Sequence, residues 1–595
     1  MVNPSASSSD FVARSPKIPR SPGLRRRGLL GGTGFAVGAM LAPLGMRPAT
    51  PAAAQPATEP QVRPLDTALR RRAADVREAR ARAVGELAVA RHPTNDDEAR
   101  YPTRIGTDTR ALPHNERGEV DPAAWRVLFD ACQSGDPADF DRIPLGGVRK
   151  LGNPVGTMAV ALTGITPTQI AIPAPPALAS AERAAEAVEV YWMALLRDVP
   201  FAEFHDGTEN RELRAAAAEL DRLSGNRGKV EGRVTPGTLL RGTALYVDET
   251  DPKGRAVRPP GVLDGPMVSQ FLLRDVPCGA QWLDARIRAA TPASEFLTEY
   301  GEWLRAQNGQ AVNGRPQFDS TPRYIATGRD LAESVRQGIS LASNVALLLL
   351  TPAGGPDPRY GGMFPISEPV LSPTNPYRRS PNQSAGSATF GAPHIQSLVN
   401  QGINLAPRGA YWQKWFLHRT LRPEAYGGLA HNRLVNGATE YPLHDDVLRS
   451  EALDRTRAKQ GSYLLSQVSP EGAPLFPAYP GGGAAVAGVV ATLMKAFFDE
   501  GRVIANPVEP DPRDPTRLAT YAGPPLTVGG ELNKMAMNWA FGRNWMGIHF
   551  WSDAAASLVI GEEIAIGMLR DERPTYREAF DGFSFTRFDG TRVTI

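Results

Sequence analysis

The stretch Leu475-Phe-Pro-Ala-Tyr-Pro-Gly-Gly-Gly-Ala484 runs directly into an apolar segment, residues 485–498. The length and apolarity of that segment predict a helix that is buried on all sides. A glycine-rich turn ahead of such a helix leaves backbone N–H groups and the positive end of the helix dipole free to bind an anion. The stretch therefore predicts a mainly helical core with an oxyanion site where this helix begins.

A second motif follows downstream and reads Arg543-Asn-Trp-Met-Gly-Ile-His549-Phe-Trp-Ser-Asp553. His549 and Asp553 are four residues apart, which on a helix puts them on one face. The carboxylate can then accept one imidazole N–H and leave the other ring nitrogen free. Arg543 lies six residues before His549 and can approach the same pocket. We predict that His549 and Asp553 are the catalytic pair of the site.

A third motif lies upstream and contains Lys414 and the dipeptide Arg422-Pro423. Eight residues of continuous helix would separate the two cations by about 12 Å along the axis. The proline predicts that the helix ends between them, because the residue before a proline is pushed out of the helical region. Arg422 can then fold back toward Lys414. The three motifs together describe a cationic cage for one oxyanion.

The order Lys-x7-Arg-Pro, Pro-Gly-Gly-Gly-Ala and Arg-x5-His-x3-Asp resembles the signature shared by vanadium-dependent haloperoxidases and the type 2 phosphatidic acid phosphatase superfamily. The eight-residue interval from lysine to arginine is similar to that of the algal-type bromoperoxidases. Flanking phrases, including Tyr411-Trp-Gln-Lys-Trp415 and Gly530-Glu-Leu-Asn-Lys534, extend the likeness over most of the chain. Three motifs in this order over about 140 residues are far more specific than any one of them.

The resemblance implies a role for each matching residue. His549 is implied as the direct ligand of vanadium and the metal site. Lys414, Arg422 and Arg543 are implied as the cations that neutralise the oxygens of vanadate. Gly482 is implied to donate its backbone amide to the same cofactor, with Gly483 in the same binding turn.

Two positions depart from the resembled pattern, because Gly481 and Gly483 stand where the family has a serine and a histidine. Loss of an acid–base histidine costs about 10²–10⁴ in rate, whereas loss of one hydroxyl contact costs about 0.5–1.5 kcal/mol. Vanadate binding should therefore survive better than turnover. A histidine restored at position 483 should raise the rate if the rest of the cage is intact.

No nearby histidine replaces the missing one, since Phe476 stands where algal bromoperoxidases have another histidine. His418 and His431 are candidate stand-ins, although an ordinary structural role is favoured for each by roughly three to one. The tryptophans of the motif regions are expected to pack in the core rather than contact halide. They are Trp412, Trp415, Trp545 and Trp551.

Composition favours a folded enzyme over a nucleic-acid binder. The chain has 595 residues, of which 42% are hydrophobic and 22% charged, with a net charge of only +3. This length supports a large buried core. Cys132 and Cys278 cannot form a disulfide framework, and the sequence leaves open whether they form one bridge.

The first 54 residues are typical of a Tat-type signal peptide. Arg25-Arg-Arg27 precedes a weakly apolar stretch that is rich in glycine and alanine, followed by the small-residue site Ala52-Ala-Ala54. Twin arginines ahead of a short apolar region and a small-residue cleavage site indicate export. So many glycines make a poor membrane-spanning helix. We expect a periplasmic or extracellular protein.

Helical patterns dominate the rest of the chain, at residues 65–89, 180–196, 211–223, 334–350, 484–499, 532–541 and 548–571. Short strands are expected near residues 244–247 and 583–595. The expected fold is mainly α, with helical bundles of the vanadium haloperoxidase type and minor short strands. Residues 55–330 form an N-terminal helical region, and residues 331–595 form the C-terminal region with the vanadate-binding motifs.

The predicted function is that of a vanadium-dependent haloperoxidase, bromoperoxidase-like, with vanadate as cofactor. Its substrates are expected to be hydrogen peroxide and halide, and its product a halogenated organic substrate or free hypohalite. A homo-oligomer is expected, and no nucleic acid. Two alternatives stay open: an acid phosphatase with His549 as nucleophile, and a catalytically impaired homologue that binds vanadate or phosphate.

Overall fold

The computed structural model describes residues 64–242, 244–247, 256–338, 340–351, 361–364, 370–384 and 387–595. Residues Leu65–Ile595 form one compact unit. The expected signal peptide lies outside the described residues. Within them, no helix is both long and apolar enough to cross a membrane.

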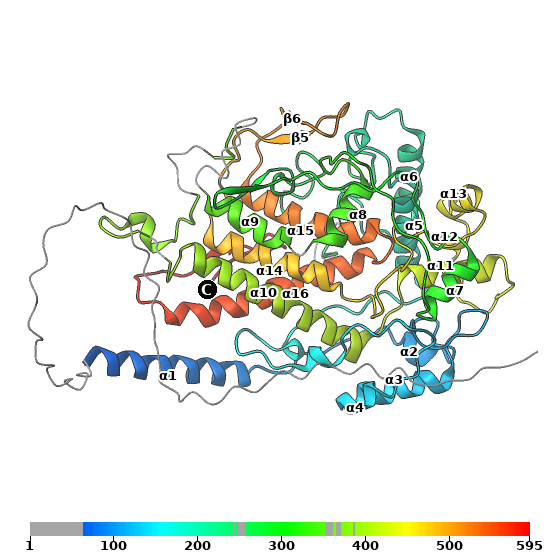
Figure 1. The fold of residues 1–595 in the computed structure, drawn as a ribbon, viewed down its shortest axis with the longest axis horizontal. Helices are drawn as coiled ribbons and strands as arrows, with labels where there is room; N and C mark the ends of the chain where they lie inside the picture. Colours follow the sequence, from blue (N-terminus) through cyan, green and yellow to red (C-terminus); the bar gives the residue numbers. More distant parts are fainter. Residues whose placement is uncertain are drawn as a thin grey trace, which may run out of the picture. The chain divides into compact units, whose positions relative to one another are not determined.

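Four long helices form the centre of the fold: α10 (Ala392–Gln413), α14 (Gly482–Phe497), α15 (Val528–Trp545) and α16 (Trp551–Glu572). α14 packs against each of the other three (Figure 1). Every residue of α14 except Gly483 is buried, as its apolar sequence predicts. α14 and α16 approach closely, since a Cβ on Gly561 would lie 2.3 Å from the carbonyl oxygen of Ala485.

Other helices cover this centre. α8 (Gly328–Gln337) packs on α15, and α9 (Ser340–Leu350) packs on α10. α5 (Ala181–Leu195) is almost wholly buried and contacts α15. The remaining α-helices are α1 (Pro64–Gly85), α2 (Asp97–Arg100), α3 (Pro122–Ser134), α4 (Pro137–Phe140), α6 (Arg211–Arg222), α7 (Tyr300–Gln307), α11 (Pro423–Leu434), α12 (Asp445–Leu448) and α13 (Glu451–Gln460).

The strands of the described residues form only two-stranded antiparallel sheets. They pair β1 (Tyr246–Val247) with β2 (Ala256–Val257), β3 (Val276–Cys278) with β4 (Gln281–Leu283), β5 (Val508–Pro510) with β6 (Leu518–Thr520), and β7 (Ser584–Thr586) with β8 (Arg592–Thr594). The expectation of a mainly α fold with minor short strands is confirmed.

Two helix predictions were wrong in detail. The predicted helix 334–350 is two helices, α8 and α9, because the chain leaves helical geometry at Gly338. The bounds of the helix that precedes Lys414, α10, were not predicted, and Pro407, which normally signals a helix end, lies inside it. The expected division near residue 330 falls within α8, and the two regions stay a prediction.

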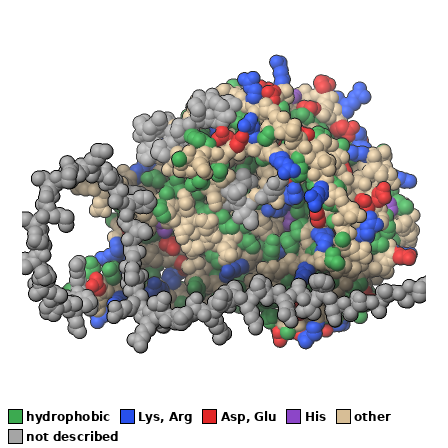
Figure 2. All heavy atoms as spheres, in the orientation of Figure 1, with side chains coloured by type: hydrophobic (Ala, Val, Ile, Leu, Met, Phe, Trp, Pro, Cys, Tyr) green, Lys and Arg blue, Asp and Glu red, His purple; other side chains and the backbone are tan. Residues whose placement is uncertain are grey.

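The two cysteines are both free thiols, with Cys132 buried and Cys278 exposed. Burial raises the pKa of Cys132 to about 11. On the face drawn in Figure 2, lysine and arginine side chains are interspersed with acidic, apolar and neutral ones. This mixture fits the small net charge of the chain.

Candidate functional site

A cavity of about 450 Å³ lies at the N-terminal end of α14. Its walls come from α8, α10, α14 and α15 and from the loops before α14 and after α15. Its charged, polar and glycine lining is Arg336, Gly338, Tyr411, Gly482, Gly483, Arg543 and His549. Four residues predicted from the motifs therefore share one cavity wall.

His549 lies in the short connection between α15 and α16. Its Nδ1 is 2.7 Å from Oδ2 of Asp553, and Nη1 of Arg422 donates to its Nε2 at 2.9 Å. A guanidinium can only donate, so Nε2 carries the lone pair and Nδ1–H donates to Asp553. Burial, and then the charge of Arg422, hold the pKa of His549 well below its usual range. The imidazole is neutral, as a metal ligand must be.

The expected contact of His549 with Asp553 is present, but its local origin differs from the prediction. His549 precedes α16, whereas Asp553 lies in its first turn. Oδ2 of Asp553 also accepts the backbone N–H of Phe550 at 3.0 Å. The carboxylate therefore stabilises the start of α16 and orients the imidazole at the same time.

Arg422 lies directly before α11 and is completely buried. Its Nε donates to the carbonyl oxygen of Phe476 at 3.0 Å, and its Nη1 donates to that of Ile548 at 2.8 Å. Its Nη2 is buried without a partner among the described residues. An unpaired N–H of a charged group is costly in a protein interior, so this atom indicates a missing acceptor.

The separation of Lys414 from Arg422 has a different cause from the one predicted. α10 ends at Gln413, a π-helical turn spans Lys414–His418, and Arg419 takes a left-handed conformation with φ 37°. Pro423 does not end this helix but begins α11. The chain therefore reverses four residues before the proline, and Arg422 folds back as expected.

Lys414 is also fully buried, and its ammonium donates to the carbonyl oxygens of Pro477 and Ala478, both at 2.6 Å. Burial, reinforced by Arg422, holds the pKa of Lys414 well below its usual range. Lys414 and Arg422 lie behind the cavity wall rather than in it. In the part of the chain that the structure describes, no carboxylate forms an ion pair with Lys414, Arg422 or Arg543.

Arg543 fills the space above Gly483. Nη1 of Arg543 donates to the carbonyl oxygen of Trp539 at 2.9 Å. A Cβ on Gly483 would lie only 2.1 Å from Nη2 of Arg543 and 2.2 Å from its Cζ. The expectation that a histidine at 483 restores turnover assumed an intact cage. A side chain at 483 requires the guanidinium of Arg543 to shift, which is the far end of a flexible side chain, so the expectation stays a prediction.

The N-terminal end of α14 has no capping side chain. Gly481 precedes the helix, and its own N–H donates to the carbonyl oxygen of Asp553 at 3.2 Å. The first N–H groups of a helix have no partner within the helix, and here Gly482 and Gly483 lie on the cavity wall. The positive end of the helix dipole therefore adds to the field of the buried cations.

Comparison with known proteins yields relatives over most of the chain. A vanadium-dependent bromoperoxidase from Ascophyllum nodosum is 32% identical over 511 residues, which cover 82% of this chain and 86% of that protein. Vanadium-dependent bromoperoxidases from Corallina pilulifera and Corallina officinalis are 31% and 30% identical, covering 86% of this chain and 94% of each relative. The chain belongs to the vanadium-dependent bromoperoxidase family. No family model matches it.

The fold comparison agrees with this assignment. A homohexameric vanadate-dependent bromoperoxidase from Ascophyllum nodosum superposes with a TM-score of 0.78 at 28% identity. The match covers 92% of this chain and 94% of that one. The prediction of a vanadium haloperoxidase is therefore confirmed, and the acid phosphatase alternative is not favoured.

The two candidate stand-in histidines do not reach the cavity at the start of α14. His418 is buried with its ring edge-on to Tyr479, at 4.9 Å between centroids, and burial lowers its pKa to about 3. His431 stacks on Tyr300 at 5.3 Å, and neither histidine lines the cavity. Both histidines pack against aromatic rings outside the cavity, so neither is placed to move protons there.

The tryptophans of the motif regions pack as expected for the most part. Trp415, Trp545 and Trp551 are buried, whereas Trp412 is half-buried, and none of the four lines the cavity. The cavity does contain Trp539, which the sequence did not single out.

Sequence reasoning also missed two polar residues of the bromoperoxidase cavity, Tyr411 and Arg336. Arg336 forms a two-pronged ion pair with Glu333, at 2.8 and 2.7 Å. Tyr411 lies one helical turn before Lys414, and this spacing of three residues was the one signal that could have identified it.

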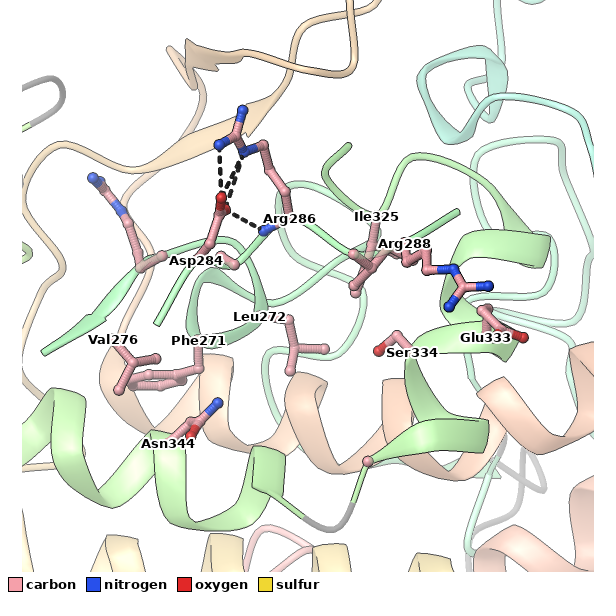
Figure 3. Close-up of a pocket in the computed structure, with 14 residues that line it drawn as sticks. Phe271, Leu272, Val276, Asp284, Arg286, Arg288, Ile325, Glu333, Ser334 and Asn344 are labelled. Atoms are coloured by element: carbon pink, nitrogen blue, oxygen red, sulfur yellow. Dashed lines mark hydrogen bonds and ion pairs between the residues drawn. The ribbon is translucent and has the colours of Figure 1, made fainter. Parts of the chain in front are cut away.

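A second cavity, of about 310 Å³, lies beside α8 (Figure 3). Phe271 and Leu272 contribute apolar side chains to it, and Arg286, which also lines it, pairs with the nearby Asp284 at 2.6 Å. Gly338 lines both cavities. None of the predicted cage residues lines the second one.

Proposed function

We propose that the chain binds vanadate in the cavity at the start of α14 and uses it to oxidise bromide with hydrogen peroxide. One observation carries this proposal: the unprotonated Nε2 of His549, which accepts from Arg422, lies among three cations, the buried Lys414 and Arg422 and the half-buried Arg543, that lack a carboxylate partner among the described residues. Such a site requires an anion that also accepts a nitrogen ligand. The named relatives, all vanadium-dependent bromoperoxidases, support this reading.

The residues present fit vanadate in charge and in donor type. His549 would hold the vanadium through Nε2 once Nη1 of Arg422 gives up its hydrogen bond to that atom, and Asp553 fixes the required tautomer. Arg543 and the unpaired Nη2 of Arg422 offer N–H donors to the oxygens, together with the amides at the start of α14. When bound, vanadate supplies a Lewis acid that activates peroxide without a change in its own oxidation state.

Lys414 has a double role in this proposal. Its ammonium holds the carbonyl oxygens of Pro477 and Ala478, which fixes the loop that leads into α14. Its positive charge also acts on the anion through the buried interior, where screening by solvent is weak.

The level of activity depends on the glycine turn. Gly481 and Gly483 offer backbone donors but no side chain that moves a proton. We therefore propose tight vanadate binding together with slow halide oxidation. If halide oxidation were absent altogether, the chain would be the impaired homologue that binds vanadate or phosphate.

Two measurements test the function. Calorimetric titration of the purified mature chain should show binding of orthovanadate, with phosphate as a competitor, and His549→Ala should abolish the vanadate signal. After vanadate loading, a phenol should be brominated in a reaction that requires bromide and peroxide together. An absence of heat and of competition would refute the site, and unchanged binding by His549→Ala would remove that residue from its role.

We further propose a homo-oligomer, in keeping with the homohexameric relative. α1 contributes no buried residue in the single chain, and its Leu65 and Leu69 are half exposed or more. Apolar side chains in such a position indicate an interface. Light scattering after size-exclusion chromatography would measure the assembly.

Export through the Tat pathway to the periplasm or the exterior also stays a proposal, supported by the twin-arginine segment. Fractionation of cells that express the whole chain, with Arg25 and Arg26 replaced by lysine as the control, would test it. Retention of the variant inside the cell is the expected result.

A further inference from the structure

Tyr411 lines the cavity at the start of α14 together with Gly482, Arg543 and His549. Its ring packs on Phe476, with centroids 4.7 Å apart, and its Cε1 is 2.2 Å from the position of a Cβ on Gly482. The ammonium of Lys414 is 5.8 Å from the centre of the ring. Only a glycine at 482 permits this approach, so the tyrosine ring and the glycine turn fit each other.

The hydroxyl of Tyr411 donates to no described group, although the side chain lines the cavity. Two fully buried tyrosines have backbone acceptors, since Tyr479 donates to the carbonyl oxygen of Pro173 and Tyr191 donates to that of Tyr463. Buried phenols normally find such a partner. A phenol that faces a cavity without one is available to a ligand.

The charge state of Tyr411 suits a donor rather than a base. Burial raises its pKa, and this effect outweighs the opposing influence of Arg543 and Arg422. The phenol therefore keeps its proton at neutral pH. A neutral O–H donates a short hydrogen bond to an anionic oxygen without placing another charge in the cage.

We propose that Tyr411 is a further catalytic residue, whose phenol O–H donates to the oxyanion in the cavity and supplies a side-chain donor that the triple-glycine turn lacks. The inference rests on the proposed function. Arg543 occupies the space where a side chain at position 483 would lie. The hydroxyl of Tyr411 approaches the same cavity from α10. The proton stays on Oη of Tyr411, and the hydrogen bond strengthens as negative charge develops on the oxygen.

Tyr411→Phe tests the inference, because it removes only the hydroxyl and keeps the ring against Phe476. Tyr426→Phe is the matched control: Tyr426 is also buried, its hydroxyl has no partner among the described residues, and it does not line the cavity. Bromination should fall about 10²- to 10³-fold in Tyr411→Phe. Its dissociation constant for vanadate should rise by less than about tenfold, as for a neutral hydrogen bond.

A second readout needs no turnover. Vanadate added to the unmodified chain should perturb the ultraviolet absorption of a tyrosine, and the perturbation should persist in Tyr426→Phe but vanish in Tyr411→Phe. An unchanged rate and an unchanged difference spectrum in Tyr411→Phe would overturn the inference and leave the proposed function standing. If the unmodified chain binds no vanadate, the proposed function fails and this inference fails with it.

Discussion

Replacement of Gly483 by alanine should weaken vanadate binding, although it adds a single methyl group. The methyl carbon would lie 2.1 Å from Nη2 of Arg543, whereas ordinary contact begins at 3.4 Å. The guanidinium must therefore move by at least about 1.3 Å. Gly481→Ala is the matched control, because its Cβ meets no atom closer than 3.3 Å.

The expected magnitude follows from the loss of one charged donor. A hydrogen bond to a charged group contributes about 1.5–3 kcal/mol, which corresponds to roughly a 10- to 150-fold change in a dissociation constant. Stability should not suffer in parallel. Gly483 lies in the first turn of α14, where alanine is the better helix former by up to about 1 kcal/mol. Gly483→Ala should therefore lose affinity without losing thermal stability.

Calorimetry with orthovanadate and thermal melting without it, on both alanine variants, provide the measurement. Gly481→Ala should bind within about threefold of the unmodified chain, since at most a few tenths of a kcal/mol are lost at a merely close contact. Gly483→His requires the same shift of the Arg543 guanidinium and should bind vanadate less tightly, whereas a gain in its bromination rate would report the restored acid–base histidine. Unaltered affinity in Gly483→Ala would show that Arg543 contributes nothing to the anion and would refute the reasoning.

Asp553→Ala should weaken vanadate binding about 10- to 100-fold, because His549 loses the partner that fixes its tautomer; calorimetry checks this, and full affinity would contradict it. His418→Phe should leave bromination within about twofold, and a large loss would return His418 to the list of proton donors. Glu189→Gln should stabilise the chain at alkaline pH more than at pH 5. Burial raises the pKa of Glu189 to about 8 in the folded chain. The protonated side chain therefore contributes fully to the free energy of unfolding below its pKa in the unfolded chain, near 4.5. This contribution falls by about 1.4 kcal/mol per pH unit as pH rises toward 8. Thermal melting of the unmodified chain and of Glu189→Gln at pH 5 and 8.5 provides the measurement. An equal change in melting temperature at the two pH values would contradict the raised pKa of Glu189.

The buried helix α14 and the pairing of His549 with Asp553 could be predicted because each depends on a local pattern. Fourteen successive residues after Ala484 offer no polar face except one lysine and one threonine, which is compatible only with burial. The spacing of four brings Asp553 to His549 even though α16 begins after the histidine, since Asp553 in its first turn accepts the N–H of Phe550 and the imidazole of the residue before it. Local spacing is robust to an error of a few residues in a helix boundary.

The features that the sequence did not reveal depend on distances between elements. Lys414 donates to the carbonyl oxygens of Pro477 and Ala478, and the guanidinium of Arg543 lies against Gly483. Both contacts depend on how α10 and α15 pack on the start of α14. No periodicity encodes such a contact. The bounds of α10 were not predicted because Pro407 normally signals a helix end. Packing on α14 and α16 keeps the chain helical on both sides of this proline.

The triple glycine is therefore more than the absence of two side chains. With no side chain at 483, the guanidinium of Arg543 comes directly against the first turn of α14, and with none at 482 the ring of Tyr411 does the same. Both close approaches place hydrogen-bond donors, the guanidinium of Arg543 and the phenol of Tyr411, near the positive end of the α14 dipole. A cage built this way concentrates positive charge where an oxyanion sits, while burial holds His549 neutral and lowers the pKa of Arg543 to about 10. The geometry thus favours holding the anion over moving protons around it, which is why binding and turnover should respond differently to each substitution.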